Sequence, residues 1–331
     1  MMTFCMMSKR ANLRSLAFGL FVAILGALLF PVKIRGQGIA RNALSSFPAD
    51  THQLVYTNLD QLRNSSQYPK IRQRLFGGQL GSFADFLRSA GADPEKDVDE
   101  VVLGWRGAAT GNTEFFGLAN GHFEPDRVRD FFTQRRLSSR DYGGFRLYAC
   151  GSGAGSREGG GSLYFTFLSS SSAAFGALSD LKALLDARSG ASPALDSNSS
   201  FLNWEAELEG SAPQWGVATG RSAASEAARW LAGGIKPPVD LGALMSPVEA
   251  ALYSIDLTDQ LSTHVSVVCD RAETAAALAQ ILTLWRNSPA ATANSSASLS
   301  AFLRGMDIGA SGSRVELSGS GPVDLLGELG R

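Results

Sequence analysis

The sequence predicts an α+β fold of duplicated ferredoxin-like (split βαβ) antiparallel sheet units behind an N-terminal transmembrane helix. Two observations underlie this prediction. The order of strand and helix patterns over residues 47–190 recurs over residues 196–331. An uncharged apolar run precedes both stretches, with basic residues on each side of it.

Bulk composition indicates a folded body and argues against one class of partner. Of the 331 residues, 44% are hydrophobic and 18% charged, so the chain is long and apolar enough for one large domain or two smaller ones. The net charge is −1 at pH 7. Because nucleic-acid binders normally show a basic excess, we expect no nucleic acid as a partner.

The N-terminal segment predicts the location. Residues 1–14 are basic, Ser15 to Val32 carry no charge, and Leu16 to Phe30 include no polar side chain. The run is short for a spanning helix and long for a signal peptide. An uncleaved anchor, a cleaved signal and a buried soluble helix all stay open. The first two place the body outside the cytoplasm, and the anchor gives a single-pass bacterial inner-membrane protein with its body in the periplasm.

Periodicity and turn residues divide the first half into alternating elements. A linker over 33–46 comes first. The predicted strands are Gln53–Thr57, Glu100–Arg106, Glu114–Asn120, Phe145–Cys150 and Ser162–Leu168. The predicted helices are Leu59–Ala90, in pieces broken at Pro69 and Gly77-Gly78, then Pro125–Arg136 and Ser179–Arg188. The Gly, Pro and Ser content of Ser189–Ser200 marks this segment as the internal boundary.

The second half repeats that order. Its elements are a strand at Gln214–Thr219, a helix at Ser222–Leu231, strands at Glu249–Asp256 and Thr263–Cys269, a helix at Arg271–Arg286, and a strand at Ser313–Ser318. Asn-Ser-Ser occurs at Asn64–Ser66, Asn198–Ser200 and Asn294–Ser296, each time ahead of a helical pattern. Their side-chain oxygens suit helix capping.

Three short motifs give a resemblance. The chain resembles uncharacterised bacterial envelope proteins, often from acidobacterial-type genomes, in Phe47-Pro48-Ala49-Asp50-Thr51, Gly121-His122-Phe123-Glu124-Pro125-Asp126-Arg127 and Gln214-Trp215-Gly216-Val217. The resemblance implies one N-terminal membrane segment and an α+β domain. It brings no known activity, so it assigns no functional residues.

Several residue patterns invite a chemical interpretation, and each lacks part of what that chemistry needs. The glycine-rich loop from Gly151 to Gly161 joins two strands, whereas a phosphate loop leads into a helix. His122 and Glu124 form His-x-Glu without the Pro-Cys-x-x-Cys of a zinc deaminase. Ser179 and Lys182 have Ser-x-x-Lys spacing without its companion motifs, so Ser179 is better explained as a helix N-cap.

The remaining candidates are charged groups and thiols. Asp97 with Asp99, and Glu205 with Glu207 and Glu209, are interpreted as solvated faces rather than paired catalytic carboxylates. Cys150 and Cys269 are expected as separate half-buried thiols, with one disulfide as the alternative. A basic stretch suits anionic headgroups or an acidic partner and comprises Arg127, Arg129, Arg135, Arg136 and Arg140.

With no complete catalytic, cofactor or metal motif, we expect a membrane-anchored extracytoplasmic binding or structural module. Its expected partners are the membrane, through Leu16 to Phe30, and an envelope protein, lipid or cell-wall component. The alternative is an envelope hydrolase with an unrecognised Asp, Glu or Ser site.

Overall fold

A computed structural model describes most of the predicted body. The described residues are 38–75, 78–106, 115–150, 163–220, 222–223, 246–288, 296–323 and 325. The chain separates into two units, Met1–Gly38 and Ile39–Arg331, and every element below belongs to the second.

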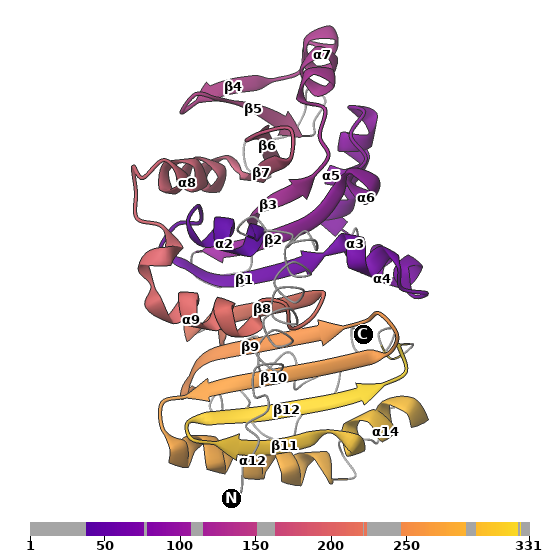
Figure 1. The fold of residues 1–331 in the computed structure, drawn as a ribbon, viewed down its shortest axis with the longest axis vertical. Helices are drawn as coiled ribbons and strands as arrows, with labels where there is room; N and C mark the ends of the chain where they lie inside the picture. Colours follow the sequence, from indigo (N-terminus) through magenta and orange to yellow (C-terminus); the bar gives the residue numbers. More distant parts are fainter. Residues whose placement is uncertain are drawn as a thin grey trace, which may run out of the picture. The chain divides into compact units, whose positions relative to one another are not determined.

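Strands of the second unit form one sheet in the order β11-β12-β10-β9-β8-β1-β2-β3-β7-β6-β5-β4 (Figure 1). The strands are β1 (Thr51–Asn58), β2 (Val98–Arg106), β3 (Phe116–Gly121), β4 (Ser139–Tyr142), β5 (Phe145–Cys150), β6 (Leu163–Phe167), β7 (Ser172–Ala177), β8 (Gln214–Thr219), β9 (Val248–Asp256), β10 (Leu261–Cys269), β11 (Asp307–Ser311) and β12 (Arg314–Gly321). Each of these neighbouring pairs is antiparallel. The first strands of the two halves, β1 and β8, pair with each other, with Val55 opposite Gly216.

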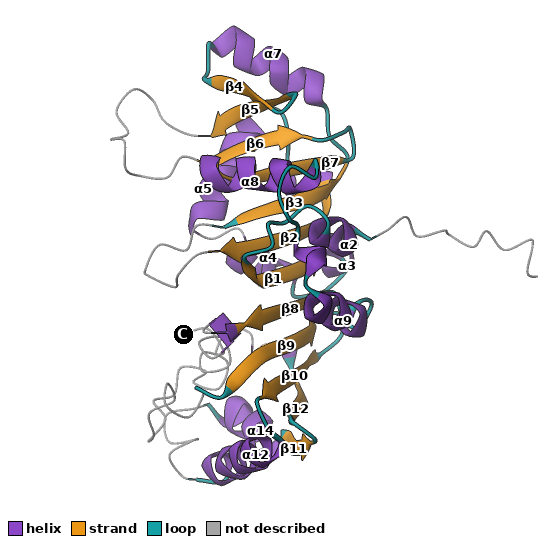
Figure 2. Cartoon of the chain, turned by 90° about the vertical axis from the view of Figure 1, so that its left-hand side faces the viewer, coloured by secondary structure: helices purple, strands orange, loops and turns teal. Residues whose placement is uncertain are grey.

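Helices cover both faces of the sheet (Figure 2). One face, which we call the α2 face, packs against α2 (Ile39–Leu44), α8 (Leu178–Arg188) and α9 (Ser199–Leu208). The other, the α5 face, packs against α3 (Leu59–Arg63), α4 (Tyr68–Leu75), α5 (Gly78–Ser89), α7 (Pro125–Arg135), α12 (Ala272–Arg286) and α14 (Ala297–Gly305). A short turn of helix, α6 (Pro94–Asp97), leads into β2.

Alternation along the strands supplies the two cores. In β2, Val102 packs in the cluster on the α2 face, whereas Val101 and Leu103 pack on the α5 face, because successive strand residues point to opposite sides. Trp215 is fully buried on the α2 face and stacks on Tyr56, with ring centroids 5.2 Å apart.

The Phe47–Thr51 motif ties the start of the body to the segment between the halves. Phe47 is fully buried against Phe116, with ring centroids 4.8 Å apart. The carbonyl of Phe47 accepts a hydrogen bond from Leu195 N–H (2.8 Å), and Ala49 N–H donates to the Pro193 carbonyl (3.1 Å). The predicted boundary therefore connects α8 to α9 while pairing with this motif.

Several predicted elements are confirmed and others need correction. The strands predicted at Phe145–Cys150 and Gln214–Thr219 match β5 and β8. Residues 39–44 form α2, with Ile39 and Leu44 buried, so the predicted linker over 33–46 is wrong there. β4, β7 and β11 were not predicted as strands, because their short or small-residue patterns give weak periodicity, whereas α9 and α14 are the helical patterns expected after Asn198–Ser200 and Asn294–Ser296.

The α+β class with a large antiparallel sheet is confirmed, but the ferredoxin-like units are not seen in the described sheet. The sheet of a ferredoxin-like unit is also antiparallel, but its third strand lies between the first two, whereas here β1 pairs directly with β2 and β8 pairs directly with β9. Element order alone cannot distinguish these cases, because it does not state which strands pair.

The prediction of a transmembrane helix is also corrected. Across the described ranges, no helix has both the length and the apolar character that crossing a bilayer requires. The predicted segment, Ser15–Val32, lies outside the described residues. The location outside the cytoplasm was inferred from that segment and stays a prediction.

Candidate binding site between helix α5 and the sheet

An apolar cavity of about 110 Å³ lies between α5 and the sheet. We call it the α5 cavity. Its walls come from α5, from the turn that leads to α6, and from strands β1, β2, β3, β6 and β7. The lining residues are Thr57, Leu59, Phe83, Ala84, Leu87, Ala92, Pro94, Asp97, Val98, Val101, Leu103, Ala119, Phe123, Phe165, Phe167, Ala173, Ala174 and Phe175.

Large rings and small side chains together explain why this space is left open. Phe83 of α5 meets Phe175 of β7 and Phe165 of β6, with ring centroids 5.6 and 6.2 Å away. The rings hold the helix at a distance from the sheet that the alanines Ala84 and Ala173 do not fill. Side chains around such a space lose packing contacts, so an empty apolar cavity lowers stability.

The lining of the cavity is almost entirely apolar. Thr57 and Asp97 supply the lining's side-chain oxygens. Asp97 ends α6, and its carboxylate accepts a hydrogen bond from the Asp93 N–H at 2.6 Å. Its carbonyl accepts one from the His122 N–H at 2.7 Å. Asp97 is therefore fixed from two directions where the cavity meets the polar surface.

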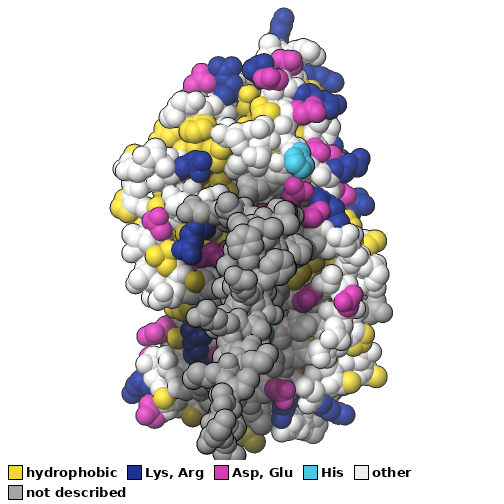
Figure 3. All heavy atoms as spheres, viewed as in Figure 1, with side chains coloured by type: hydrophobic (Ala, Val, Ile, Leu, Met, Phe, Trp, Pro, Cys, Tyr) yellow, Lys and Arg dark blue, Asp and Glu magenta, His cyan; other side chains and the backbone are white. Residues whose placement is uncertain are grey.

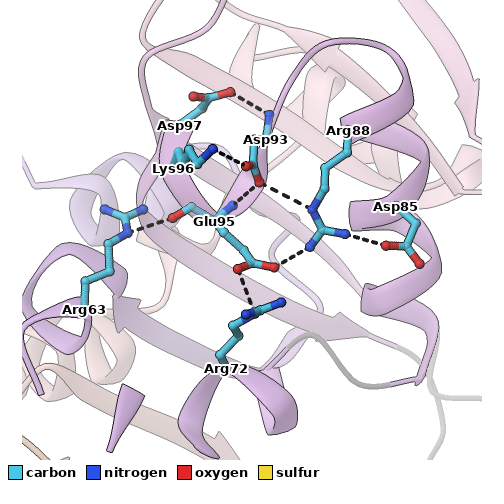
Figure 4. A network of polar contacts seen from close by, with 8 residues as sticks. All are labelled: Arg63, Arg72, Asp85, Arg88, Asp93, Glu95, Lys96 and Asp97. Atoms are coloured by element: carbon cyan, nitrogen blue, oxygen red, sulfur yellow. Dashed lines mark hydrogen bonds and ion pairs between the residues drawn. The ribbon is translucent and has the colours of Figure 1, made fainter. Parts of the chain in front are cut away.

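A network of ion pairs holds together the helices near Asp97 (Figure 4). Arg88 of α5 contacts the carboxylates of Asp85, Asp93 and Glu95. Glu95 also accepts from Arg72 of α4, with Nε and Oε2 2.7 Å apart. Several charges share these contacts, so the network restrains α4, α5 and α6 more than one isolated surface pair would.

A charged cleft adjoins the α5 cavity and shares Ala92 and Asp97 with it. The cleft has a volume of about 380 Å³ and is lined by Arg88, Gly91, Ala92, Asp93, Asp97, His122, Glu124 and Arg127. The Arg127 side chain crosses Gly91 so closely that a Cβ there would lie 2.4 Å from its Nε. The Arg127 side chain is 62% exposed, and its ion-pair contact with Glu124 is long, at 3.5 Å.

The three histidines lie on different elements. His52 Nδ1 is 2.7 Å from Ser222 Oγ, next to residues outside the described ones. His122 Nε2 is 3.8 Å from Asp99, and His264 Nε2 is 3.1 Å from Glu316. Among the described residues, no group of His, Cys, Asp and Glu is arranged to hold a metal ion.

Of two other candidate motifs from the sequence, the structure describes Ser179 with Lys182. The glycine-rich loop lies outside the described residues, but the strands that flank it, β5 and β6, pair antiparallel. Ser179 is not an N-cap, because α8 begins at Leu178 and its N-cap is Ala177. Lys182 lies over the ring of Tyr142, 4.7 Å from its centroid.

Asparagine and serine caps are confirmed at two of three triplets. Asn198 accepts from the N–H groups of Ser200 and Phe201 at the start of α9, and Ser296 accepts from Leu299 N–H at the start of α14. Asn64 instead ends α3 as its C-cap.

The glutamates of α9 differ from the prediction of one solvated face. Glu205 is buried and Glu207 pairs with Arg314, with Nη1 and Oε1 2.6 Å apart. Glu205 shares a helical stripe with Phe201 and Leu208, which are also buried. That i, i+4, i+7 spacing is the signal that could have predicted its burial.

The basic stretch and the thiols have ordinary surroundings. Arg127 and Arg129 of α7 pair with Glu124 and Asp126 of the same turn. Figure 3 shows basic and acidic side chains mixed at the end of the molecule where Figure 1 places α7.

Cys150 and Cys269 are free and buried, which confirms separate thiols, and burial raises the pKa of both.

The α5 cavity itself was not predicted from the sequence. Its residues come from stretches between Thr57 and Phe175, and each strand among them has an ordinary apolar pattern. A volume that side chains leave unfilled depends on how helix and sheet approach each other, which no local pattern records.

Comparison with known proteins gives information on the fold alone. No protein-family model and no curated protein matches the chain. The crystal structure of TP0453, in its crystal form I, is similar to it with a TM-score of 0.54 at 10% sequence identity. The similarity covers 87% of this chain and 95% of that one. The predicted likeness to acidobacterial-type envelope proteins stays a prediction.

Proposed function

We propose that the protein is a non-enzymatic binding module that holds a small apolar group in the α5 cavity. The proposal rests on the cavity's lining, in which rings and aliphatic side chains surround the space and Thr57 and Asp97 are the side chains with oxygen atoms. Concave, mostly apolar sites with a few placed polar groups are typical of small-molecule binding.

The size of the cavity limits what it can accept. An apolar cavity of roughly 150 Å³ holds benzene, so the 110 Å³ here suits a ring of that size or about four to six chain carbons. Each buried methylene contributes about 0.8 kcal/mol. The ligand is then a short alkyl or aromatic group, or the end of a longer one.

A hydrolase receives less support from the same residues. Asp97 lines the cavity without a second carboxylate in its wall, and glycoside hydrolysis uses two. Elsewhere, Ser266 Oγ donates to Glu316, which also approaches His264. In a nucleophilic triad the serine donates to the imidazole instead.

Binding of primary alcohols of increasing chain length, measured by calorimetry, tests the proposal. We expect affinity to rise by about fourfold per carbon up to about six carbons and then to level off. A continued rise for much longer chains, or no binding at any length, would contradict the α5 cavity as the site.

Filling the cavity should abolish binding and stabilise the protein. In Ala84→Leu the added carbons occupy the space, so we expect alcohol binding to be lost and the free energy of unfolding to rise by about 1 kcal/mol. Ala173→Val is a second filling variant from the opposite wall. Ala301→Leu, on the exposed side of α14, is the control and should bind alcohols as the unaltered protein does. Equal binding by Ala84→Leu and its control would overturn the proposal.

A further inference from the structure

The α5 cavity and the charged cleft adjoin each other, because Ala92 and Asp97 line both. We propose that one ligand, a single-chain amphiphile with a zwitterionic head, occupies the two together. Its apolar end lies in the cavity and its head lies in the cleft. This inference rests on the function proposed above.

The charges of the cleft indicate the kind of head. Arg88 and Arg127 supply positive charge, while Asp93, Asp97 and Glu124 supply negative charge. A head of one sign would meet repulsion from the groups of that sign. A head with both signs can place each charge beside an opposite one.

The charged side chains of the cleft differ in how firmly their neighbours hold them. Arg88 and Asp93 already share ion pairs in the network, so they form a fixed wall. Arg127 has a long contact with Glu124 and a mostly exposed side chain, so it can turn to a phosphate or carboxylate. Asp97 lies at the junction, where a cationic group directly next to the chain would pass.

Four ligands with the same hexyl chain test the proposal: a carboxybetaine, with its quaternary ammonium next to the chain and its carboxylate at the far end, a sulfate, a trimethylammonium and the plain alcohol. Calorimetry at concentrations where each is monomeric should show the carboxybetaine binding most tightly. Exposed charge contacts contribute up to about 1 kcal/mol, so we expect roughly fivefold tighter binding than for the alcohol.

Variants of the cleft separate the head from the chain. Arg127→Gln should remove most of the carboxybetaine's advantage and leave hexanol binding unchanged, because Arg127 lines the cleft and not the cavity. Arg140→Gln removes the same charge from β4, outside the cleft, and should alter neither ligand.

Two outcomes would overturn the proposal in distinguishable ways. If hexanol binds as tightly as the carboxybetaine, or if a head of one sign binds best, the zwitterionic head is wrong while the cavity stands. If no hexyl ligand binds, or if Ala84→Leu binds all four unchanged, the cavity is wrong as well.

Discussion

Replacing Gly121 with alanine will destabilise the protein by about 3 kcal/mol, as measured by denaturant unfolding, because the new methyl group has no space. A Cβ at this position would lie 1.8 Å from the Asp97 carbonyl oxygen and 2.8 Å from its carbonyl carbon. Both atoms are backbone, so no side chain can turn away to relieve the contact.

The expected separation of β3 from Asp97 also affects the α5 cavity. The Asp97 carbonyl accepts the His122 N–H, and Val98 pairs with Gly121 beside a register shift in β2. Separating the strands there moves Asp97 away from the cavity, so Gly121→Ala should also weaken alcohol binding. Gly309→Ala is the matched control, since a Cβ on this β11 residue meets open space. Equal stability of the two variants would contradict the described approach of β3 to Asp97.

Replacing Arg41 with alanine will destabilise the protein by about 2 kcal/mol at pH 7 and by much less at acidic pH. Arg41 of α2 lies 3.2 Å from the carboxylate of Glu205 in α9, whose side chain is only 2% exposed. Neither carboxylate oxygen of Glu205 has a hydrogen-bond partner in the described part of the chain. Without Arg41 the buried charge loses the cation beside it.

The pH dependence follows from the pKa of Glu205. Burial raises this pKa above its usual value, and Arg41 opposes the rise. A raised folded-state pKa means that the native state holds the proton more tightly than the unfolded chain. Stability is therefore highest below the unfolded pKa and falls as pH rises toward the folded pKa. Removing Arg41 raises the folded-state pKa of Glu205 further. The loss of stability caused by Arg41→Ala therefore appears only at pH values where Glu205 is ionised.

A double-mutant cycle isolates this interaction. In a Glu205→Gln background, Arg41→Ala should cost at least 1 kcal/mol less at pH 7, because no buried charge is left unpaired. Arg314→Ala breaks the more exposed Glu207 pair on the same helix and should cost between about 0 and 1 kcal/mol. If Arg41→Ala lowers the free energy of unfolding equally at pH 7 with Glu205 and with Gln at position 205, the buried charge of Glu205 is not the cause.

Sequence reasoning predicted most strands and helices because their patterns are local. The helix at Pro125 has a proline in its first turn and an apolar stripe through Val128 and Phe132, both of which are buried. The pairing of strands is not a local property. That β1 lies between β2 and β8, with no third strand between β1 and β2, depends on contacts between distant segments.

The site was harder to predict than the fold. Candidate chemistry was sought in motifs such as His122 with Glu124, whereas the α5 cavity is made by ordinary apolar residues that meet only after folding. Asp97 was noted for its carboxylate beside Asp99, yet its place at the cavity follows from the turn of α6. Glu205 could have been found from its helical stripe.

If the α5 cavity is apolar and accessible to ligands, it will bind xenon under pressure, which diffraction from a pressurised crystal can show. We expect a xenon atom bounded by Phe83, Leu103 and Phe175. Density for ordered water or for a repacked side chain in that space, with no xenon, would contradict it.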